Sequence, residues 1–355
     1  MELRGFRNLE PLSVVPGERF NVLYGDNAAG KSSLLEAIDY IATLRSFRSA
    51  KTEDLIQDGE EHALMRVHMR GSSLPRSFEC RLHRNAPREL LLDGKRPRSI
   101  AVWHASVHAV TFQPGDLDLA AGGPDSRRVW LDRVLMQMDP TYASALATYT
   151  RALRSRNRLL KAERPDRRAI TSFNEMLATS GVVLSLARER LLSDVSPLAS
   201  SAFQEIAGDD VGLTVSYKPR VSSDVADARR ALEESLDKDL LRGFTAEGPH
   251  ADDVALQLAE SNARHHASQG QHRALVLSLK VAELLVLARR TGHTPVLLLD
   301  DVSSELDRGR NRRFFSLLSK MGGQVFLSTT HREFILLDEA RTEFRVENGR
   351  ISRES

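Results

Sequence analysis

The chain has 355 residues, of which 41% are hydrophobic and 28% are charged, and its formal net charge is +2 at pH 7. This length allows two or three domains, and the composition is that of a globular protein without extensive disorder. No run approaches the ~18 apolar residues of a membrane span, and no secretion signal follows Met1. The single cysteine, Cys80, excludes disulfide frameworks and cysteine-clustered metal sites. We therefore expect a cytoplasmic protein without membrane association.

A strand, a glycine-rich turn and a helix are predicted in succession near the N-terminus. Residues 20–24 form a short apolar segment, and apolar residues recur at helical spacing over residues 33–42. The residues between them fit the G-x-x-x-x-G-K-[ST] phosphate loop at every fixed position. Together with the serine that follows, the predicted nucleotide-binding loop consists of Gly25, Asp26, Asn27, Ala28, Ala29, Gly30, Lys31, Ser32 and Ser33.

This loop has the groups that bind a nucleoside triphosphate. Its glycines let backbone N–H groups turn toward an anion, and the helix N-terminus adds the positive end of its dipole. Lys31 would reach the β- and γ-phosphates, and the Ser32 hydroxyl would bind Mg²⁺. A chance match in a turn before a helix is the alternative, which the flanking strand and helix make weaker. The loop alone does not separate kinases, GTPases and ATPases.

Short strands follow the phosphate-loop helix. Residues 62–69, 77–82 and 89–92 have strand character, and turn-forming residues separate them. They predict an antiparallel β-layer beside the nucleotide site.

Helices dominate the middle of the chain. From about residue 126 to 207 the strand-like alternation stops, and residues 142–161 and 170–192 show helical spacing. Pro165 and Pro197 interrupt these helices too soon for the very long coiled coil of a chromosome-tethering ATPase. We therefore expect a helical subdomain, followed by a strand near residues 212–218.

Basic residues are concentrated in one segment of this helical region. Residues 151–168 hold eight basic and two acidic side chains, although the net charge of the whole chain gives no such signal. Such a cluster can neutralise DNA phosphates, and a solvated helix face would explain it equally well. The candidates for DNA contact are Arg127, Arg128, Arg151, Arg154, Arg158 and Lys161.

Alternating helices and strands return near the C-terminus. Helices are predicted over residues 271–290 and 311–321, and strands over residues 296–299 and 324–328. Because the phosphate loop lies near the other end of the sequence, one nucleotide-binding fold is expected to be split between the two ends of the chain.

Two carboxylates follow the buried strand at residues 296–299. Asp300 would bind Mg²⁺, directly or through water, and Asp301 would polarise the attacking water. An aspartate pair that caps the following loop is the alternative. The phosphate loop far upstream favours the first interpretation, because strand-end carboxylates and a phosphate loop are the paired parts of one site.

Further motifs resemble those of the ABC ATPases. In that class a Ser, a Gly and a helix N-terminus of one subunit close over the γ-phosphate that the other subunit holds, and residues 268–271 resemble this signature loop. Residues 304–307 lie where the class has its D-loop. The resemblance implies that one glutamine binds Mg²⁺ and, with a switch histidine, senses the γ-phosphate. The residues assigned on this basis are Ser268, Gly270, Gln271, Asp307, Gln113 and His331.

Within that class, the chain resembles the RecF family of bacterial DNA repair ATPases over almost its whole length. The matching segments include residues 3–8, 45–48, 112–117, 156–161 and 248–250. The resemblance implies a weak ATPase that dimerises around ATP and binds gapped or junction DNA. It also implies action with RecR, and through RecR with RecO and the loading of RecA onto single strands.

Three positions depart from the family pattern. Ala251 stands where arginine is expected, and His272 stands where a second glutamine is usual. Asp301 stands where many ABC ATPases have glutamate. The shorter acid would place the water less well, which agrees with the slow turnover that the resemblance implies.

The expected fold is α/β, with an ABC-type P-loop ATPase lobe, an antiparallel β subdomain and a helical second lobe. We expect residues 1–118 to form the N-terminal part of the ATPase lobe, residues 119–244 the helical lobe, and residues 245–355 the C-terminal part of the ATPase lobe. The ATP-hydrolysing subunit of a membrane transporter is the first alternative function. A phosphoryl-transfer enzyme that acts on a small metabolite as a monomer is the second.

Overall fold

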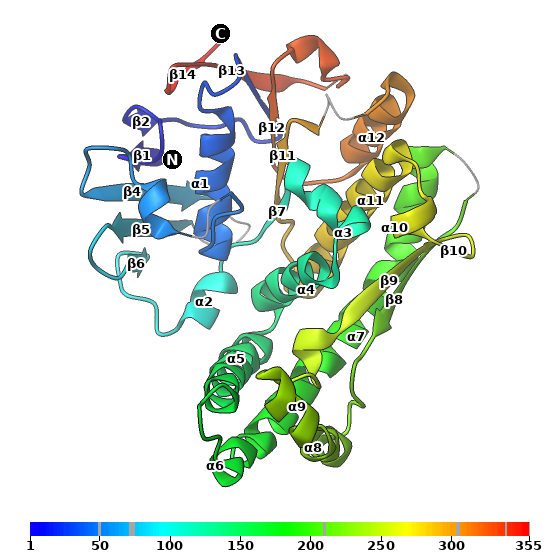
Figure 1. Ribbon diagram of the computed structural model, residues 1–355. Coiled ribbons are helices and arrows are strands. Elements are labelled where there is room, and N and C mark those ends of the chain that lie inside the picture. The colour runs from blue at the N-terminus through cyan, green and yellow to red at the C-terminus, as the bar shows by residue number, and fades with distance from the viewer. Residues whose placement is uncertain (49–50, 71–74, 209–210, 303–305, 338, 355) are drawn as a thin grey trace.

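The computed structural model describes residues 1–355 except 49–50, 71–74, 209–210, 303–305, 338 and 355. The chain forms two lobes (Figure 1). One lobe surrounds helix α1 and contains the strands from both ends of the chain, and the other is mainly helical and extends away from it.

The lobe around α1 is built on a six-stranded sheet in the order β14-β13-β3-β12-β11-β7. Its neighbouring strands are parallel except for β14, which runs antiparallel to β13. Strands β7 and β12 are buried along their whole length, as expected where both faces of a parallel sheet are covered. The strands are β3 Phe20–Tyr24, β7 Ala109–Phe112, β11 Val296–Asp300, β12 Val325–Thr329, β13 Arg341–Glu347 and β14 Arg350–Arg353.

A second sheet covers the other side of α1 (Lys31–Thr43). It is antiparallel, in the order β2-β1-β4-β5-β6, and includes the three strands predicted after the phosphate loop. Leu35 of α1, Phe78 of this sheet and Leu298 of the parallel sheet belong to one buried cluster, so α1 lies between two β-layers. The remaining elements of this layer are β1 Glu2–Arg4, β2 Leu12–Ser13, β4 His62–Met69, β5 Arg76–His83, β6 Glu89–Leu92 and the short helix α2 Ile100–His104.

The second lobe is mainly helical, as its spacing predicts. Helix α7 is its central element and packs against α5, α8, α11 and α12. The helices of this lobe and of its junction with the sheet are α3 Asp118–Ala121, α4 Pro124–Met138, α5 Pro140–Leu160, α6 Arg167–Thr171, α7 Asn174–Ala207, α8 Val225–Glu234, α9 Leu236–Arg242, α10 Ala263–His266, α11 Gln269–Thr291 and α12 Arg308–Lys320.

The expected interruption at Pro197 is wrong. Helix α7 runs for 34 residues through this proline and ends at Ala207, where Gly208 caps it in a left-handed conformation. A proline inside a helix removes one backbone hydrogen bond. Ala199 and Phe203, which follow it, are fully buried in the core, so packing offsets the local loss.

A small antiparallel sheet completes the second lobe. Strand β9 (Asp253–Leu258) pairs with β8 (Leu213–Lys218) on one side and with β10 (Ser261–Asn262) on the other. The expected domain boundary between residues 244 and 245 therefore lies between two strands of one sheet, and the division of the chain stays a prediction. Among the described strands, β1, β2, β7, β9, β10, β13 and β14 were not predicted from the sequence.

Candidate nucleotide-binding site

The phosphate loop lies between β3 and α1, and its two fixed glycines are conformationally required. Gly25 has φ 151°, and a Cβ atom there would lie 2.1 Å from the carbonyl oxygen of Val346. Gly30, with φ 115°, is the N-cap of α1, where a Cβ would lie 2.8 Å from Leu9. These positive φ values are readily adopted only by glycine. The loop therefore holds its shape against β13 and the segment after β1.

The C-terminal hairpin formed by β13 and β14 braces this loop. Besides the contact between Gly25 and Val346, the N–H of Gly349 donates a hydrogen bond of 2.8 Å to the carbonyl oxygen of Ala29. Gly349 itself lies in the tight turn of the hairpin, with φ 82° and with a Cβ position only 2.0 Å from the carbonyl oxygen of Asn8. Substitution of Gly349 would thus disturb the phosphate loop indirectly.

Lys31 lies at the first turn of α1 with its amine directed at the loop. Its Nζ donates to the carbonyl oxygens of Gly25 at 2.7 Å and Asp26 at 2.8 Å. Burial lowers the pKa of Lys31, and the carboxylates of Asp301 and Asp300 oppose that change. A cationic amine in a partly buried, carboxylate-lined position is suited to binding phosphate oxygens.

Two motifs that are 268 residues apart in sequence meet at Asp300. The Ser32 hydroxyl donates to Asp300 Oδ1 at 2.8 Å, and the Ser328 hydroxyl donates to the same oxygen at 2.6 Å. Asp300 is only 7% exposed and ends β11, beside the end of β12 that carries Ser328. A hydroxyl and a carboxylate at hydrogen-bonding distance are oxygen donors of the kind that Mg²⁺ prefers, so these residues fit the metal.

Asp301 follows in a backbone conformation that is unusual for its type. Its φ is 52°, in the left-handed region, and its N–H donates to the Ser328 hydroxyl at 3.0 Å. Non-glycine residues held in this region store strain, which is frequent at functional sites. The side chain lines the same cleft as Lys31 and Ser32.

The cleft above the phosphate loop has a volume of about 730 Å³. Six residues of the phosphate loop, the carboxylates Asp300 and Asp301, and residues at the C-terminal ends of β12 and β7 face it. It is lined by Arg7, Asn8, Asn27, Ala28, Gly30, Lys31, Ser32, Ser33, Arg48, Asp54, Ile56, Gln57, Asp58, Pro114, Asp300, Asp301, Ser328 and Thr330. This volume lies within the range of ordinary small-molecule sites, so a nucleotide fits.

Asn8 and Arg7 support the site and were not assigned a role from the sequence. The Asn8 side chain donates to the carbonyl oxygen of Ala28 at 2.9 Å and accepts from the Ser33 hydroxyl at 2.8 Å. Arg7 binds Glu36 of α1 through two hydrogen bonds of 2.9 and 2.8 Å. Their only sequence signal is membership of the family-like opening at residues 3–8, because no local motif marks them.

Gln113 and His331 lie beside the cleft, and neither is among the described residues that line it. Gln113 lines an adjoining cavity of about 390 Å³, which also contains Arg133 and Trp130, while the next residue, Pro114, lines the nucleotide cleft. The His331 side chain is 60% exposed and packs against the ring of Phe334. Their assignment as γ-phosphate sensors stays a prediction.

The signature residues form the start of α11, where Ser268 is exposed and Gly270 and Gln271 are half-buried. Ser268 is the N-cap, its hydroxyl accepts from the N–H of Gln271 at 3.2 Å, and the Gln271 side chain accepts from the N–H of Ser268 at 2.9 Å. This reciprocal capping box fixes the turn. A Cβ at Gly270 would lie 2.1 Å from the Arg310 guanidinium, so a larger residue there would require that flexible side chain to move.

Asp307 lies at the N-cap of α12 and reaches the same surface through Arg310. It accepts from the N–H groups of Gly309 and Arg310, and these backbone hydrogen bonds, with the Arg310 charge, lower the pKa of Asp307. Ser304 and Glu305 of the predicted D-loop lie outside the described residues. None of Ser268, Gly270, Gln271 and Asp307 is among the described residues that line the cleft of their own chain.

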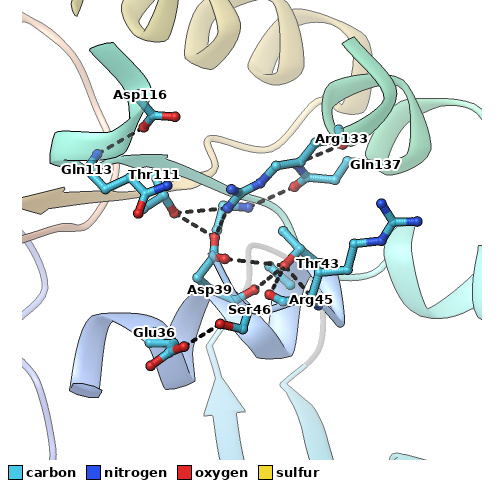
Figure 2. A network of polar contacts seen from close by, with 12 residues as sticks. Glu36, Asp39, Thr43, Arg45, Ser46, Thr111, Gln113, Asp116, Arg133 and Gln137 are labelled. Atoms are coloured by element: carbon cyan, nitrogen blue, oxygen red, sulfur yellow. Dashed lines mark hydrogen bonds and ion pairs between the residues drawn. The ribbon is translucent and has the colours of Figure 1, made fainter. Parts of the chain in front are cut away.

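A buried polar network connects α1 to the second lobe (Figure 2). Arg133 of α4 forms an ion pair with Asp39 of α1, and Thr111 of β7 donates to the same carboxylate at 2.6 Å. Burial raises the pKa of Asp39, and Arg133 opposes that change. Gln113 follows Thr111 by two residues, so one network contacts the phosphate-loop helix, the strand before Gln113 and the helical lobe.

The six candidates for DNA contact fall into two groups. Arg151, Arg154, Arg158 and Lys161 are exposed along α5 and immediately after it. Arg127 is instead buried, where it forms two hydrogen bonds with Asp253 at 2.7 and 3.2 Å and donates to two backbone carbonyls. Arg128 donates to the carbonyl oxygen of Asp252 at 2.6 Å and pairs with Asp125. These contacts direct Arg127 and Arg128 toward the protein rather than toward DNA.

No described helix is both long enough and apolar enough to cross a membrane.

Residues 1–352 match the family described as RecF/RecN/SMC N terminal domain. Named relatives cover nearly the whole chain. The DNA replication and repair protein RecF of Anaeromyxobacter sp. (strain Fw109-5) is 37% identical, with 99% of this chain and 98% of the relative covered. That of Thermosynechococcus vestitus is 38% identical, with 93% and 90% covered.

Solved structures show the same likeness. A structure of the recombination mediator protein RecF-ATPrS in the RecFOR pathway has a TM-score of 0.90 and 30% identity, and the match covers 100% of this chain and 97% of that chain. The Smc head domain of Pyrococcus furiosus has a TM-score of 0.57 and 15% identity, which shows the fold alone. The predicted α/β fold with an ABC-type ATPase lobe and a helical second lobe is confirmed.

Proposed function

The chain belongs to the RecF family, and from this premise we propose that it is an ATP-dependent DNA-binding protein of recombinational repair and replication restart. It binds ATP, hydrolyses it slowly to ADP and phosphate, and uses the nucleotide as a switch. The convergence of Lys31, Ser32 and Asp300 on one cleft carries this proposal, because it joins the phosphate loop to the strand-end carboxylates.

The loop residues would bind ATP through its phosphates. Phosphate oxygens would take the place of the Gly25 and Asp26 carbonyl oxygens as acceptors for Lys31, and the amides at the start of α1 would face the same anion. The proposed magnesium ligands are Ser32 and Asp300, with Gln113 as a third when the segment after β7 moves toward them. When bound, Mg²⁺ would neutralise negative charge on the β- and γ-phosphate oxygens.

Asp301 is the proposed group that accepts a proton from the attacking water. It follows Asp300 directly and lines the cleft. His331 and Gln113 are the proposed sensors of the γ-phosphate, because they follow the C-terminal ends of β12 and β7, which border the cleft. The aspartate side chain is shorter than the glutamate found in many ABC ATPases, so it would position the attacking water less well. This supports a slow rate of ATP hydrolysis.

Dimerisation around ATP is the second part of the proposal. The turn of Ser268, Gly270 and Gln271, together with Asp307, would complete the cleft of a second copy, since these residues do not line the described cleft of their own chain. A γ-phosphate shared between two copies links nucleotide binding and self-association reciprocally. The dimer therefore binds ATP more tightly than the monomer does, and ADP releases it.

DNA is the proposed macromolecular ligand, in gapped or duplex/single-strand junction form. The exposed basic residues Arg151, Arg154, Arg158 and Lys161 would contact its phosphates, so affinity falls steeply with salt. The proposal further includes a cytoplasmic location, cooperation with RecR, and through it with RecO and the loading of RecA. Likeness over nearly the whole chain favours this function over a transporter subunit or a small-metabolite kinase.

Light scattering with ATP, with ADP and without nucleotide tests the shared site. The wild-type chain should dimerise only with ATP. Lys31→Arg should impair hydrolysis more than nucleotide binding, and Ser268→Arg should bind ATP as a monomer and fail to dimerise. Ser193→Arg, at an exposed serine of α7, is the matched control and should dimerise normally. An undiminished Ser268→Arg dimer would overturn the shared site, and equal association in all three nucleotide states would overturn the switch.

A further inference from the structure

The end of the second lobe that lies farthest from the sheets carries an apolar pair that the proposed ATP switch does not use (Figure 1, α5, α6 and α9). The Leu241 side chain is 90% exposed at the end of α9, and Phe244 is 47% exposed just after it. Single exposed leucines are ordinary on protein surfaces, whereas an exposed aromatic three residues after an almost fully exposed leucine offers a larger accessible apolar surface. We call Leu241 and Phe244 the tip pair.

The tip pair is fixed to the end of α5 by buried and partly buried hydrogen bonds. Arg156 of α5 and Asp239 of α9 form a fully buried ion pair at 2.7 Å, and Arg156 also donates to the Thr245 hydroxyl. The side chain of Asn157 accepts from both the N–H and the hydroxyl of Thr245, at 2.9 and 2.7 Å. These contacts flank Phe244 on both sides in sequence, so the segment cannot move independently of α5.

A row of basic side chains on α5 leads toward the tip pair. Arg151, Arg154, Arg158 and Lys161 recur at intervals of three and four residues, which places them on one side of α5, and all are exposed. In the part of the chain that the structure describes, no acidic side chain pairs with Arg154, Arg158 or Lys161. The Lys161 stem lies 3.5 Å from the Cβ position of Gly243, directly between Leu241 and Phe244 in sequence.

This combination favours nucleic acid with an unstacked base over duplex alone. A basic row can follow a phosphate backbone without regard to sequence, but an apolar pair gains nothing from phosphates. It gains contact area from the face of a base, because every base presents a π-face to an aromatic ring. In a continuous duplex these faces are covered by stacking, and they become accessible where the duplex opens into a single strand.

We propose that Leu241 and Phe244 contact unpaired bases at a duplex/single-strand junction while the α5 row binds the adjoining phosphates. This inference rests on the proposed DNA-binding function and adds to it the residues that distinguish a junction from a blunt duplex. The phosphate row provides affinity common to both DNA forms, and the tip pair provides the difference between them.

Fluorescence anisotropy with ATP present tests this assignment on the full chain. Two probes are compared: a labelled blunt duplex, and the same duplex with a single-stranded gap. The wild-type chain should bind the gapped probe more tightly, and Leu241→Ser with Phe244→Ser should reduce that preference at least about fivefold while leaving the blunt-duplex affinity unchanged. Both side chains are exposed, so the double variant should still dimerise with ATP in light scattering.

Three further variants separate the contributions. Phe244→Tyr keeps the aromatic face and should keep the preference, whereas Phe244→Leu should lose most of it. Arg154→Ala with Arg158→Ala should weaken binding to both probes about equally and lower the salt dependence by about one unit for each lost phosphate contact. Val15→Ser, at an exposed apolar side chain of the other lobe, is the control and should change nothing.

The outcomes distinguish this inference from the function on which it rests. Full junction preference in the double variant would overturn the inference and leave DNA binding intact. Equal wild-type affinity for the two probes would likewise overturn it. Absence of any ATP-dependent DNA binding by the wild-type chain would overturn the proposed function, and the inference with it.

Discussion

Asp301 combines a strained backbone with a position in the cleft. Its φ of 52° lies in the left-handed region, which is unfavourable for residues other than glycine. Glycine would adopt the same conformation without strain. Replacement by glycine should therefore raise the free energy of unfolding by about 1 kcal/mol. The same change removes the proposed proton acceptor, and ATP hydrolysis should fall on the order of 100-fold. Urea unfolding and phosphate release measure the two effects.

Asn348 provides a matched control for this prediction. It has a similar φ of 48° but lies in the turn between β13 and β14. Asn348→Gly should leave hydrolysis unchanged and should not lower stability. If Asp301→Gly hydrolyses ATP at the wild-type rate, the carboxylate has no part in the reaction.

Other residues of the site differ in how far they could be predicted. The phosphate loop and Asp300 could be proposed from the sequence because each is a contiguous motif with its own strand, and the structure brings Ser32 and Asp300 into contact. Asn8 and Arg7 were not assigned roles, because β1 brings them to the loop only by pairing with β4, a contact over some sixty residues of sequence. Arg127 was misplaced, because composition does not show which arginines of a helix face inward.

Between elements, the ion pair of Asp39 and Arg133 is the most buried polar connection from α1 to α4. Asp39→Ala would leave a buried guanidinium without its acid, which should lower the free energy of unfolding by about 3–5 kcal/mol. The double variant Asp39→Leu with Arg133→Met should recover much of this loss, because it buries no unpaired charge. Urea denaturation of the wild type, both single variants and the double variant measures the coupling.

The exposed ion pair of Arg167 and Asp237 is the control for this cycle. Both side chains are more than half exposed, so Asp237→Ala should change stability by less than about 1 kcal/mol. A loss at Asp39→Ala no larger than this would show that the network does not hold the two lobes together. If Asp39→Leu with Arg133→Met is stable but its DNA binding depends less on ATP than that of the wild type, the network also couples nucleotide binding to the helical lobe.

Prediction of the elements succeeded where a periodic pattern was bounded by turn residues. Strands β3, β4 and β6 have the predicted limits, since glycine or asparagine turns mark their ends. Helix α7 passes through Pro197 because its buried face outweighs the local signal. Strand β7 has only four residues and no alternation, and its identity depends on pairing with β11, nearly two hundred residues away.

At the scale of the whole molecule, three buried or half-buried histidines make stability depend on pH. Burial lowers the pKa of His104, His108 and His250 below the ordinary value of 6.5. The unfolded chain therefore binds protons first as the pH falls, so stability that is present above pH 6.5 decreases on acidification. Each histidine contributes a slope of up to about 1.4 kcal/mol per pH unit.

Urea midpoints at pH 7 and pH 5.5 test this dependence. The wild-type midpoint should be lower at pH 5.5. His250→Gln should show a smaller decrease, because one group that the native state keeps neutral is gone. His265→Gln, at an exposed position of α10, should decrease as the wild type does. An identical decrease in His250→Gln and the wild type would rule out His250 as a source of the acid sensitivity.

The brace that β13 and Gly349 give the phosphate loop has a consequence for protein synthesis. A ribosome makes residues 25–33 early and the hairpin that supports them only after more than three hundred further residues. The nascent chain therefore carries its lysine and serine for most of translation without a formed pocket. We therefore expect nucleotide capture to begin only once the segment through Gly349 has emerged.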